Sequence, residues 1–307
     1  MIYEGRIQMS TYTIGINVFN EEKNLPRLLA VLLAETDFPI ILYNDGSTDR
    51  SKDILFELFE KTDRITIIDS QENKGYAVGF MSLVKACPSE ILIMMDADTY
   101  PKPGAIKELL KPFHDPRVGA VSGAHIVLEG NSRVLNLVNL RIIQAKRRLD
   151  SIRSSRGEFT HMNGLLMAFR VKTLRDNKYM GCNQDAFIGW LIHQNGYRVV
   201  FNPRAESWFK PPATLKEYLS SRDRILMGHM NLSLDWGIRE YFWAYGSLSE
   251  YVYSILMAGR LNLPGILSLL FASWVDLFYR LKWWNKVRAH PRVYTSLKWE
   301  QLASTKF

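Results

Sequence analysis

Two aspartates that follow an apolar run are the residues of this chain best suited to hold a metal ion. The run 91–95 has the length of a buried strand, and Asp96 and Asp98 stand directly after it, two positions apart. Because side chains along a strand alternate with a period of two, the two carboxylates share one face. Carboxylate oxygens are preferred ligands of Mg²⁺ and Mn²⁺, which often bind substrate phosphates as well. The pair indicates either a cation site for a phosphate-bearing ligand or a solvated acidic turn.

Three further apolar runs upstream also end in polar residues. They cover residues 12–19, 40–43 and 65–69, and the polar segments after them are Asn20-Glu21-Glu22, Asn44-Asp45-Gly46-Ser47-Thr48-Asp49 and Asn73-Lys74-Gly75. Apolar residues at helical spacing lie between the runs, as in 54–59. This alternation predicts an α/β fold with a largely parallel sheet, which binds ligands at the carboxyl ends of its strands. For any single segment the alternative is a helix cap after a turn.

Size and charge narrow the classes of partner. The chain has 307 residues, enough for one large domain or two small ones, and its formal net charge is +8. Such a charge favours an anionic partner, either nucleotide phosphates, nucleic acid or a membrane surface. The basic residues are spread along the chain without zinc-finger spacing or a basic arm, which argues against nucleic acid. Cys87 and Cys182 form no metal-ligand pattern and imply no disulfide framework.

Taken in order, the polar segments resemble those of a family 2 glycosyltransferase with the Rossmann-like GT-A fold. The resemblance covers residues 11–228. Within the family, the chain resembles a minimal cellulose-synthase-like enzyme or a lipid-linked mannosyltransferase. Besides the segments above, the resemblance rests on Asn17-Val18-Phe19, Asp96-Ala97-Asp98, His161-Met162-Asn163-Gly164, Asn183-Gln184-Asp185 and Ser221-Arg222-Asp223-Arg224. It implies an α/β GT-A domain that binds a nucleoside-diphosphate sugar.

The resemblance also implies roles for individual residues. The donor would contact Val18, Phe19, Glu21, Asp45, Lys74, Gly75, Asp96, Ala97, Arg222 and Arg224, and the acceptor Asn163, Gly164 and Gln184. A Mn²⁺ or Mg²⁺ ion would be held by Asp96 and Asp98. Such an ion neutralises the charge that develops on the leaving diphosphate. Apart from the resemblance, we expect His229 to contact the metal or a phosphate; the alternative for Arg222, Arg224 and His229 is the polar face of a helix.

Asp185 matches the catalytic base of the family. It would take a proton from the acceptor hydroxyl as that oxygen attacks the anomeric carbon, and a single base implies one displacement with inversion. The alternative for Asp185 is the N-cap of the helix that begins near Ala186.

Two departures from the family pattern bear on the reaction. Gln184 precedes the base where the family often has Glu, which removes a charge but keeps hydrogen bonding. Processive synthases carry a Gln-x-x-Arg-Trp motif, and here its aligned positions are Ser221, Arg224 and Ile225. The missing Gln and Trp favour the addition of a single sugar. Arg224 still suits a diphosphate, because a guanidinium matches phosphate oxygens.

The last third of the chain changes character. Residues 242–259 contain one charge, Glu250, and residues 261–279 also contain one, Asp276. Each stretch has the length of a bilayer crossing, and basic and aromatic residues flank the pair. We expect either a transmembrane hairpin, or helices that lie in the membrane interface or in a buried core. The basic amphipathic stretch 134–152 is expected either on the membrane surface or packed on the sheet.

The sequence thus predicts three parts. They are a catalytic GT-A domain over 1–211, interface helices with the Arg-x-Arg motif over 212–241, and a membrane-associated hairpin with a basic tail over 242–307. We expect a membrane enzyme whose catalytic domain faces the cytoplasm. It would transfer one sugar from a nucleotide donor, GDP-mannose ahead of UDP-sugars, to a lipid-linked or other glycan acceptor near the membrane.

Three alternatives remain. One is a soluble glycosyltransferase with a different acceptor. The second is a sugar nucleotidyltransferase, which the Gly-poor segment 13–17 disfavours because these enzymes carry a Gly-rich phosphate loop near the N-terminus. The third is a catalytically silent membrane scaffold, which would not need Asp45, Asp96, Asp98 and Asp185 together.

Overall fold

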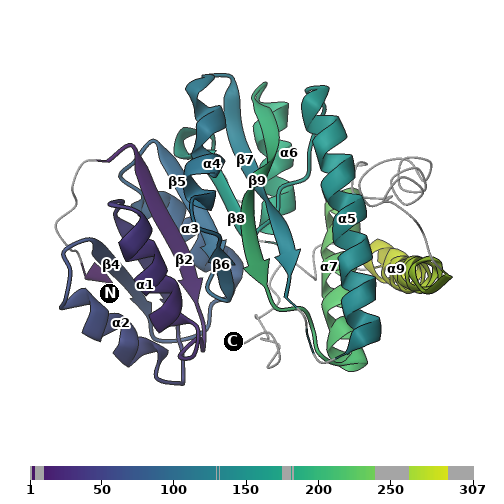
Figure 1. Cartoon of the computed structure of the whole chain (residues 1–307), viewed down its shortest axis with the longest axis horizontal. Coiled ribbons are helices and arrows are strands. Elements are labelled where there is room, and N and C mark those ends of the chain that lie inside the picture. The colour runs from purple at the N-terminus through teal and green to yellow at the C-terminus, as the bar shows by residue number, and fades with distance from the viewer. Residues whose placement is uncertain are drawn as a thin grey trace.

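Four parallel strands with helices between them form the N-terminal half of the protein. The computed structural model describes residues 2–3, 10–128, 130, 132–174, 181, 183–238 and 263–289. The parallel strands are β2 (Tyr12–Val18), β3 (Ile40–Asp45), β4 (Ile65–Ser70) and β5 (Ile91–Asp96), and the helices between them are α1 (Leu25–Glu35), α2 (Ser51–Phe59) and α3 (Tyr76–Ala86). The predicted α/β organisation of this half is confirmed (Figure 1).

The second half of the sheet contains strands of both directions. Its elements are β6 (Thr99–Pro101), α4 (Ala105–Leu110), β7 (Val118–Val127), α5 (Arg133–Ser155), β8 (Leu166–Arg170), α6 (Gln184–Gln194) and β9 (Arg198–Phe209). With the short edge strand β1 (Ile2–Tyr3) they complete a nine-stranded sheet of order β1-β4-β3-β2-β5-β8-β7-β9-β6. Strand β8 runs antiparallel to both β5 and β7, whereas β7 and β9 keep the direction of β5. The sheet is therefore mixed but mostly parallel, as predicted.

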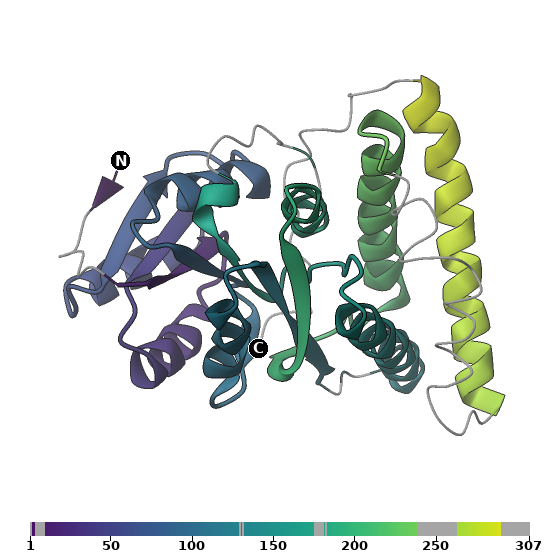
Figure 2. The same ribbon diagram turned by 90° about the horizontal axis from the view of Figure 1, so that it is seen from above.

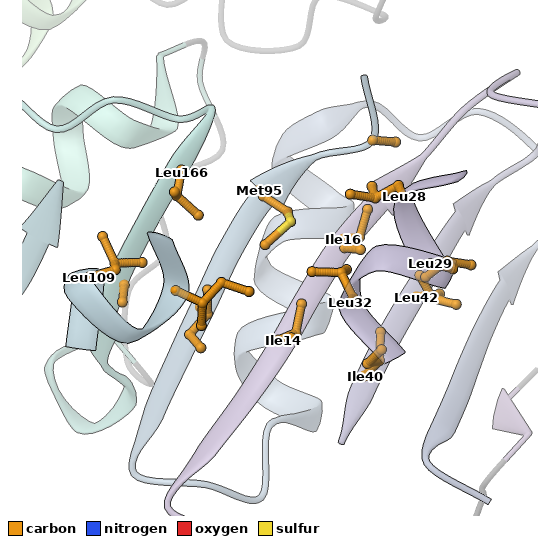
Figure 3. Close-up of a cluster of buried hydrophobic side chains, with 14 of the residues drawn as sticks. Ile14, Ile16, Leu28, Leu29, Leu32, Ile40, Leu42, Met95, Leu109 and Leu166 are labelled. Carbon is orange, nitrogen blue, oxygen red and sulfur yellow. The ribbon is translucent and has the colours of Figure 1, made fainter. Parts of the chain in front are cut away.

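Two apolar cores lie on the two faces of the sheet because alternate strand residues point in opposite directions. Ile14, Ile16, Ile40, Leu42 and Met95 pack against α1, α2 and α4, and Figure 3 shows this cluster with Leu28, Leu29, Leu32, Leu109 and Leu166. The intervening residues, such as Ile41 and Met94, pack against α3 and α6. This three-layer arrangement fixes the strand ends that carry the polar segments.

Helices α7 (Leu215–Asp235) and α9 (Leu263–Ala289) lie side by side at the end of the molecule opposite β1 (Figure 2). Helix α5 lies against β7 and β9 and also contacts α9, so the stretch 134–152 packs on the sheet. Ala272 and Val275 of α9 share an apolar cluster with Leu135 of α5 and Tyr218 of α7. These three helices therefore form one unit with the sheet.

The predicted transmembrane hairpin is not found in the part of the chain that the structure describes. None of the helices in that part combines the length and apolar content that a membrane crossing requires. The first predicted crossing, 242–259, lies outside the described residues. The second became α9, which continues beyond residue 279 through Arg280, Lys282 and Lys286 and pairs its Asp276 with Arg222 of α7.

The turn after β3 packs closely against the loop after β4, and a substitution in this turn can test that packing. Gly46 has φ +67°, and a Cβ there would lie 2.4 Å from the carbonyl carbon of Glu72. We expect Gly46→Ala to lower the free energy of unfolding by about 2–4 kcal/mol, because it adds a backbone clash to the strain of positive φ. Gly104→Ala is the matched control, with φ +78° and nothing within 4 Å of its Cβ. Urea denaturation should show a loss of about 1 kcal/mol in the free energy of unfolding for the control. Equal losses for the two variants would contradict the close approach of Gly46 to the Glu72 backbone.

Candidate active site

The parallel register brings the polar strand ends to one edge of the sheet. Asn17 pairs with Asp96, Val18 with Asn44, and Asp45 with Ser70. The loops that follow β2, β3, β4 and β5 therefore start side by side. This edge holds most of the residues predicted to bind a donor.

Asp45, Lys74 and Gly75 come together at this edge. The Asp45 carboxylate accepts the backbone N–H groups of Lys74 (2.8 Å) and Gly75 (3.0 Å). Gly75 has φ 90° and precedes α3, so glycine is needed where the chain turns into the helix. Burial raises the pKa of Asp45, and the two N–H groups oppose that rise. Asp45 thus fixes the loop that contains Lys74 and Gly75.

Val18, Phe19 and Glu21 lie at the end of β2 and in the loop after it. The Val18 side chain is fully buried in the core, so a ligand would meet its backbone only. The buried Glu21 carboxylate accepts the side-chain N–H of Asn24 at 2.6 Å, and the Glu21 backbone N–H donates to Ser51 Oγ. The first bond stabilises the loop after β2, and the second connects this loop to the start of α2, after β3.

Asp96 is the centre of a cluster of carboxylates. Its pKa is raised well above the ordinary value by burial and then by the charges of Asp98 and Asp185, while Arg224 opposes this and Glu21 adds to it. The Tyr76 hydroxyl donates to Asp96 Oδ1 at 3.4 Å. Like charges crowded in a buried site favour the binding of a cation. Ala97 is buried between the two aspartates.

Asp96 and Asp98 fit a divalent cation whose remaining ligands come from the substrate. Hard cations bind through one or two carboxylates together with substrate phosphates. The described residues include no group of three or more His, Cys, Asp or Glu side chains that would enclose an ion alone. When bound, the ion would neutralise the diphosphate of a nucleotide donor.

The metal role predicted for His229 stays a prediction. His229 is a buried residue of α7, and its ring lies 5.7 Å from that of His161, edge to face. Burial lowers its pKa well below the ordinary value, followed by the charges of Arg280 and Arg222. Among the described residues, no group of three His, Cys, Asp or Glu side chains joins His229 to Asp96 and Asp98 around an ion.

Asp185 lies in the first turn of α6, with its carboxylate held by backbone donors. Asp185 Oδ2 accepts the Gly164 N–H at 3.0 Å, and Oδ1 accepts the Ala186 N–H at 2.8 Å. Burial raises its pKa, and these N–H groups oppose the rise, as does the charge of Lys146. The N-cap position belongs to Asn183, so the capping alternative for Asp185 is not observed. A carboxylate with these properties suits a general base.

The three predicted acceptor residues have different surroundings. Because β8 starts beside the end of β5, Asn163 and Gly164 lie next to the aspartate cluster. Asn163 accepts a hydrogen bond from Lys146 Nζ and donates its side-chain amide to Gly123 O. Gln184 is buried and donates to Gly181 O at 3.0 Å, which holds the turn before α6. Asn163 and Gly164 are therefore placed beside the base, and Gln184 beneath it.

Arg222 and Arg224 point to opposite sides of α7, as residues two apart on a helix do. Arg222 forms an ion pair with Asp276 of α9, with both carboxylate oxygens accepting at 2.6 Å. Arg224 acts on the pKa of Asp96, which places its charge near the carboxylate cluster. Of the two, only Arg224 is arranged to meet a donor diphosphate.

Sequence reasoning missed Lys146 and Tyr76. Lys146 belongs to a basic amphipathic stretch, and the spacing that predicts its helix gives no sign that it faces Asn163. Tyr76 follows β4, and two strands separate β4 from β5 in the sheet, so its contact with Asp96 could not be predicted from neighbouring strand ends.

The family model of glycosyl transferase family 2 matches residues 13–176, and the chain belongs to this family. It is 27% identical over 234 residues to a poly-beta-1,6-N-acetyl-D-glucosamine synthase of Staphylococcus aureus. A synthase of that name from Staphylococcus epidermidis is 26% identical over 220 residues. These matches cover 72% and 68% of this chain but 55% and 52% of the relatives, so the chain spans about half their length.

Two solved structures share the fold. A mannosyltransferase from Pyrobaculum calidifontis, in complex with GDP-Man and Mn²⁺, superimposes with a TM-score of 0.54 at 20% identity, covering 92% of this chain and 84% of that one. S. aureus TarS in complex with UDP-GlcNAc gives 0.51 at 13% identity, covering 91% and 92%. The GT-A-like architecture predicted from the sequence is thereby confirmed.

The aspartate pair gives the first test of the site. We expect Asp98→Asn to weaken GDP or UDP binding in Mn²⁺ about tenfold or more, because one carboxylate ligand is lost. Excess chelator should weaken binding to the wild type similarly and have little further effect on the variant. Asp53→Asn, an exposed acid on α2, is the matched control. Calorimetric titration that shows wild-type affinity for Asp98→Asn would exclude the metal role.

Proposed function

We propose that this protein transfers one sugar, with inversion, from a nucleoside-diphosphate sugar to a hydroxyl of a glycan or lipid-linked acceptor. The observation that carries this proposal is the closeness of a backbone-held carboxylate, Asp185, to the Asp96 cluster, since the two interact electrostatically. A donor diphosphate at Asp96 and Asp98 would put its anomeric carbon between the cluster and the base.

Each side chain then has one task. Asp185 accepts the proton of the acceptor hydroxyl as its oxygen attacks the anomeric carbon. Arg224 contributes positive charge to the departing diphosphate. Asp45 holds the loop of Lys74 and Gly75 against the nucleotide. A divalent cation at Asp96 and Asp98, when bound, supplies further neutralisation of the diphosphate.

For the donor we propose GDP-mannose ahead of UDP-sugars. The mannosyltransferase that shares the fold binds GDP-Man with Mn²⁺, which supports the first choice, and TarS with UDP-GlcNAc supports the second. The Staphylococcus relatives are named for a polymer. The Ser221 and Ile225 positions, where processive synthases have Gln and Trp, favour a single transfer here.

The base gives the decisive test of the proposed reaction. Asp185→Asn keeps the size of the side chain but cannot take a proton, so turnover should fall roughly 10²- to 10⁴-fold while donor affinity stays nearly constant. Release of GDP or UDP from the donor measures turnover, and calorimetry measures affinity. Asp115→Asn, an acid on the surface loop before β7, is the control. Near-normal turnover of Asp185→Asn would exclude this mechanism, and pyrophosphate-dependent synthesis of the nucleotide sugar would identify a nucleotidyltransferase instead.

We also propose that α9 lies on an anionic membrane surface, with the catalytic domain on the cytoplasmic side. Between Leu263 and Leu281 every exposed residue of α9 is apolar: Leu263, Pro264, Ile266, Leu267, Leu270, Trp274, Leu277, Phe278 and Leu281. The charged Asp276 and Lys282 instead pair with α7, on the inner side. Exposed Lys286 and Arg288 follow at the end of the helix, where they suit lipid phosphates.

Vesicle binding tests this surface. The double variant Leu270→Asp with Trp274→Asp should bind vesicles containing phosphatidylglycerol at least tenfold more weakly than the full-length wild type, because two large apolar side chains no longer enter lipid. Leu215→Asp on α7, which is 51% exposed where Leu270 is 61%, is the matched control. Vesicle sedimentation with equal binding of the two variants would contradict the proposal. A wild type that forms a stable dimer lost in the double variant would assign the face to a second copy.

A further inference from the structure

A short chain of partly buried hydrogen bonds connects the proposed base, Asp185, to a lysine. Gly164 gives its N–H to Asp185 Oδ2, and its Cα lies against that carboxylate, since a Cβ would sit 3.4 Å from the same oxygen. The residue before it, Asn163, is fixed by Ser122 Oγ and by Gly123 O. The turn 163–164 therefore has no freedom to move without moving the base.

Lys146 of α5 completes this chain from the opposite side. Its Nζ donates to Asn163 Oδ1 and lies 3.2 Å from Asp150 Oδ2, in a side chain that is only 15% exposed. Asp150 is itself buried. A charge held in such a site acts on its neighbours with little screening by water.

The charge of Lys146 acts on the pKa of three buried histidines and of Asp185. Burial lowers the pKa of His125 to about 3, and Lys146 adds to the effect. The pKa of His161 is lowered in the same way, by burial first and Lys146 second, and that of His229 by burial and several cations that include Lys146. These histidines are therefore neutral at physiological pH, which leaves Lys146 as a cation that acts on Asp185.

On the other side of the base the charges are negative. Asp185 raises the pKa of Asp96 and of Tyr76, together with Asp98. The Ala186 and Gly164 N–H groups lower the pKa of Asp185 most, and the charge of Lys146 adds to this effect, so all three oppose the uptake of a proton beside this cluster.

Resting on the proposed function, we infer that Lys146 is a positioning residue for the base: through the turn 163–164 it holds the Asp185 carboxylate in place and supplies the counter-charge that keeps it ionised. It does not touch the reacting atoms. Nothing in the pattern of the glycosyltransferase motifs marks it, because it lies on α5, outside all of them.

The test uses the full chain with Mn²⁺ and follows nucleoside diphosphate release from GDP-mannose and UDP-N-acetylglucosamine, with water as acceptor. Lys146→Gln keeps a hydrogen bond to Asn163 but removes the charge. Because the base works only when ionised, the rate falls as pH falls through its pKa, and loss of the cation should move this fall to higher pH. We expect ~10- to 100-fold lower turnover at acidic pH, a smaller loss at alkaline pH and an unchanged KM for the donor.

Three further variants make the result specific. Lys146→Arg should restore most of the wild-type pH profile, since it keeps the charge. Asp150→Asn should move the acid limb to lower pH, because it removes the negative charge that lies 3.2 Å from Lys146 Nζ. Arg147→Met is the matched control, since Arg147 is the next residue on α5 and pairs with Glu206 instead. It should leave the profile unchanged.

The outcomes separate this inference from the proposed function. If Asp185→Asn keeps turnover, the proposed base is wrong and the reaction must be reconsidered. If Asp185→Asn loses turnover while Lys146→Gln and Asp150→Asn both retain the wild-type pH profile, only the role of Lys146 is overturned. In the Asp185→Asn background, Lys146→Gln should cost little, because no carboxylate remains to be kept ionised.

Discussion

Repulsion among carboxylates at one edge of the sheet is the constraint on which the rest of the site depends. The parallel register places Asp96 beside the end of β2, and Asp98, Asp185 and Glu21 all raise its pKa. Such a group of like charges is costly in a buried site unless donors and cations surround it. The structure supplies backbone N–H groups to the neighbouring acids and directs Arg224 to the centre. This group of carboxylates suits a cation that binds together with an anionic donor, as the proposed function requires.

Helix α7 divides its charges between two tasks. Arg222 and Asp223 meet Asp276 and Lys282 of α9, while Arg224 reaches toward the carboxylate cluster. In these ion pairs Asp276 and Lys282 face α7, and the exposed side of α9 between Leu263 and Leu281 is apolar. The same pairing fixes the rotation of α7 about its axis, because the two salt bridges lie on one face. The orientation of Arg224 and the apolar surface of α9 thus have a common structural cause.

The sequence predicts best where burial imposes a simple period. Strands β2 to β5 were predictable because they are continuous apolar runs, and the meeting of Asp45 with Lys74 and Gly75 follows from parallel strands alone. The reversal at β8 was not, since an apolar run carries no mark of its direction. In a similar way, the spacing of residues on α7 could not predict that Arg222 pairs with Asp276 of α9. Position on a helix gives the face of a side chain, but only the tertiary arrangement gives its partner.

The environment of Asp185 shows why burial and hydrogen bonding have to act against each other in a base. Burial alone would leave the carboxyl protonated, and strong ion pairing alone would make it too weak a base to accept a hydroxyl proton. Here burial raises the pKa, two backbone N–H groups lower it, and Lys146 acts from behind Asn163 rather than at the carboxylate itself. A cation at this remove favours the ionised form without occupying the oxygen that would receive the proton in the proposed reaction. In the proposed mechanism, this indirect connection therefore lets one carboxylate remain both charged and basic.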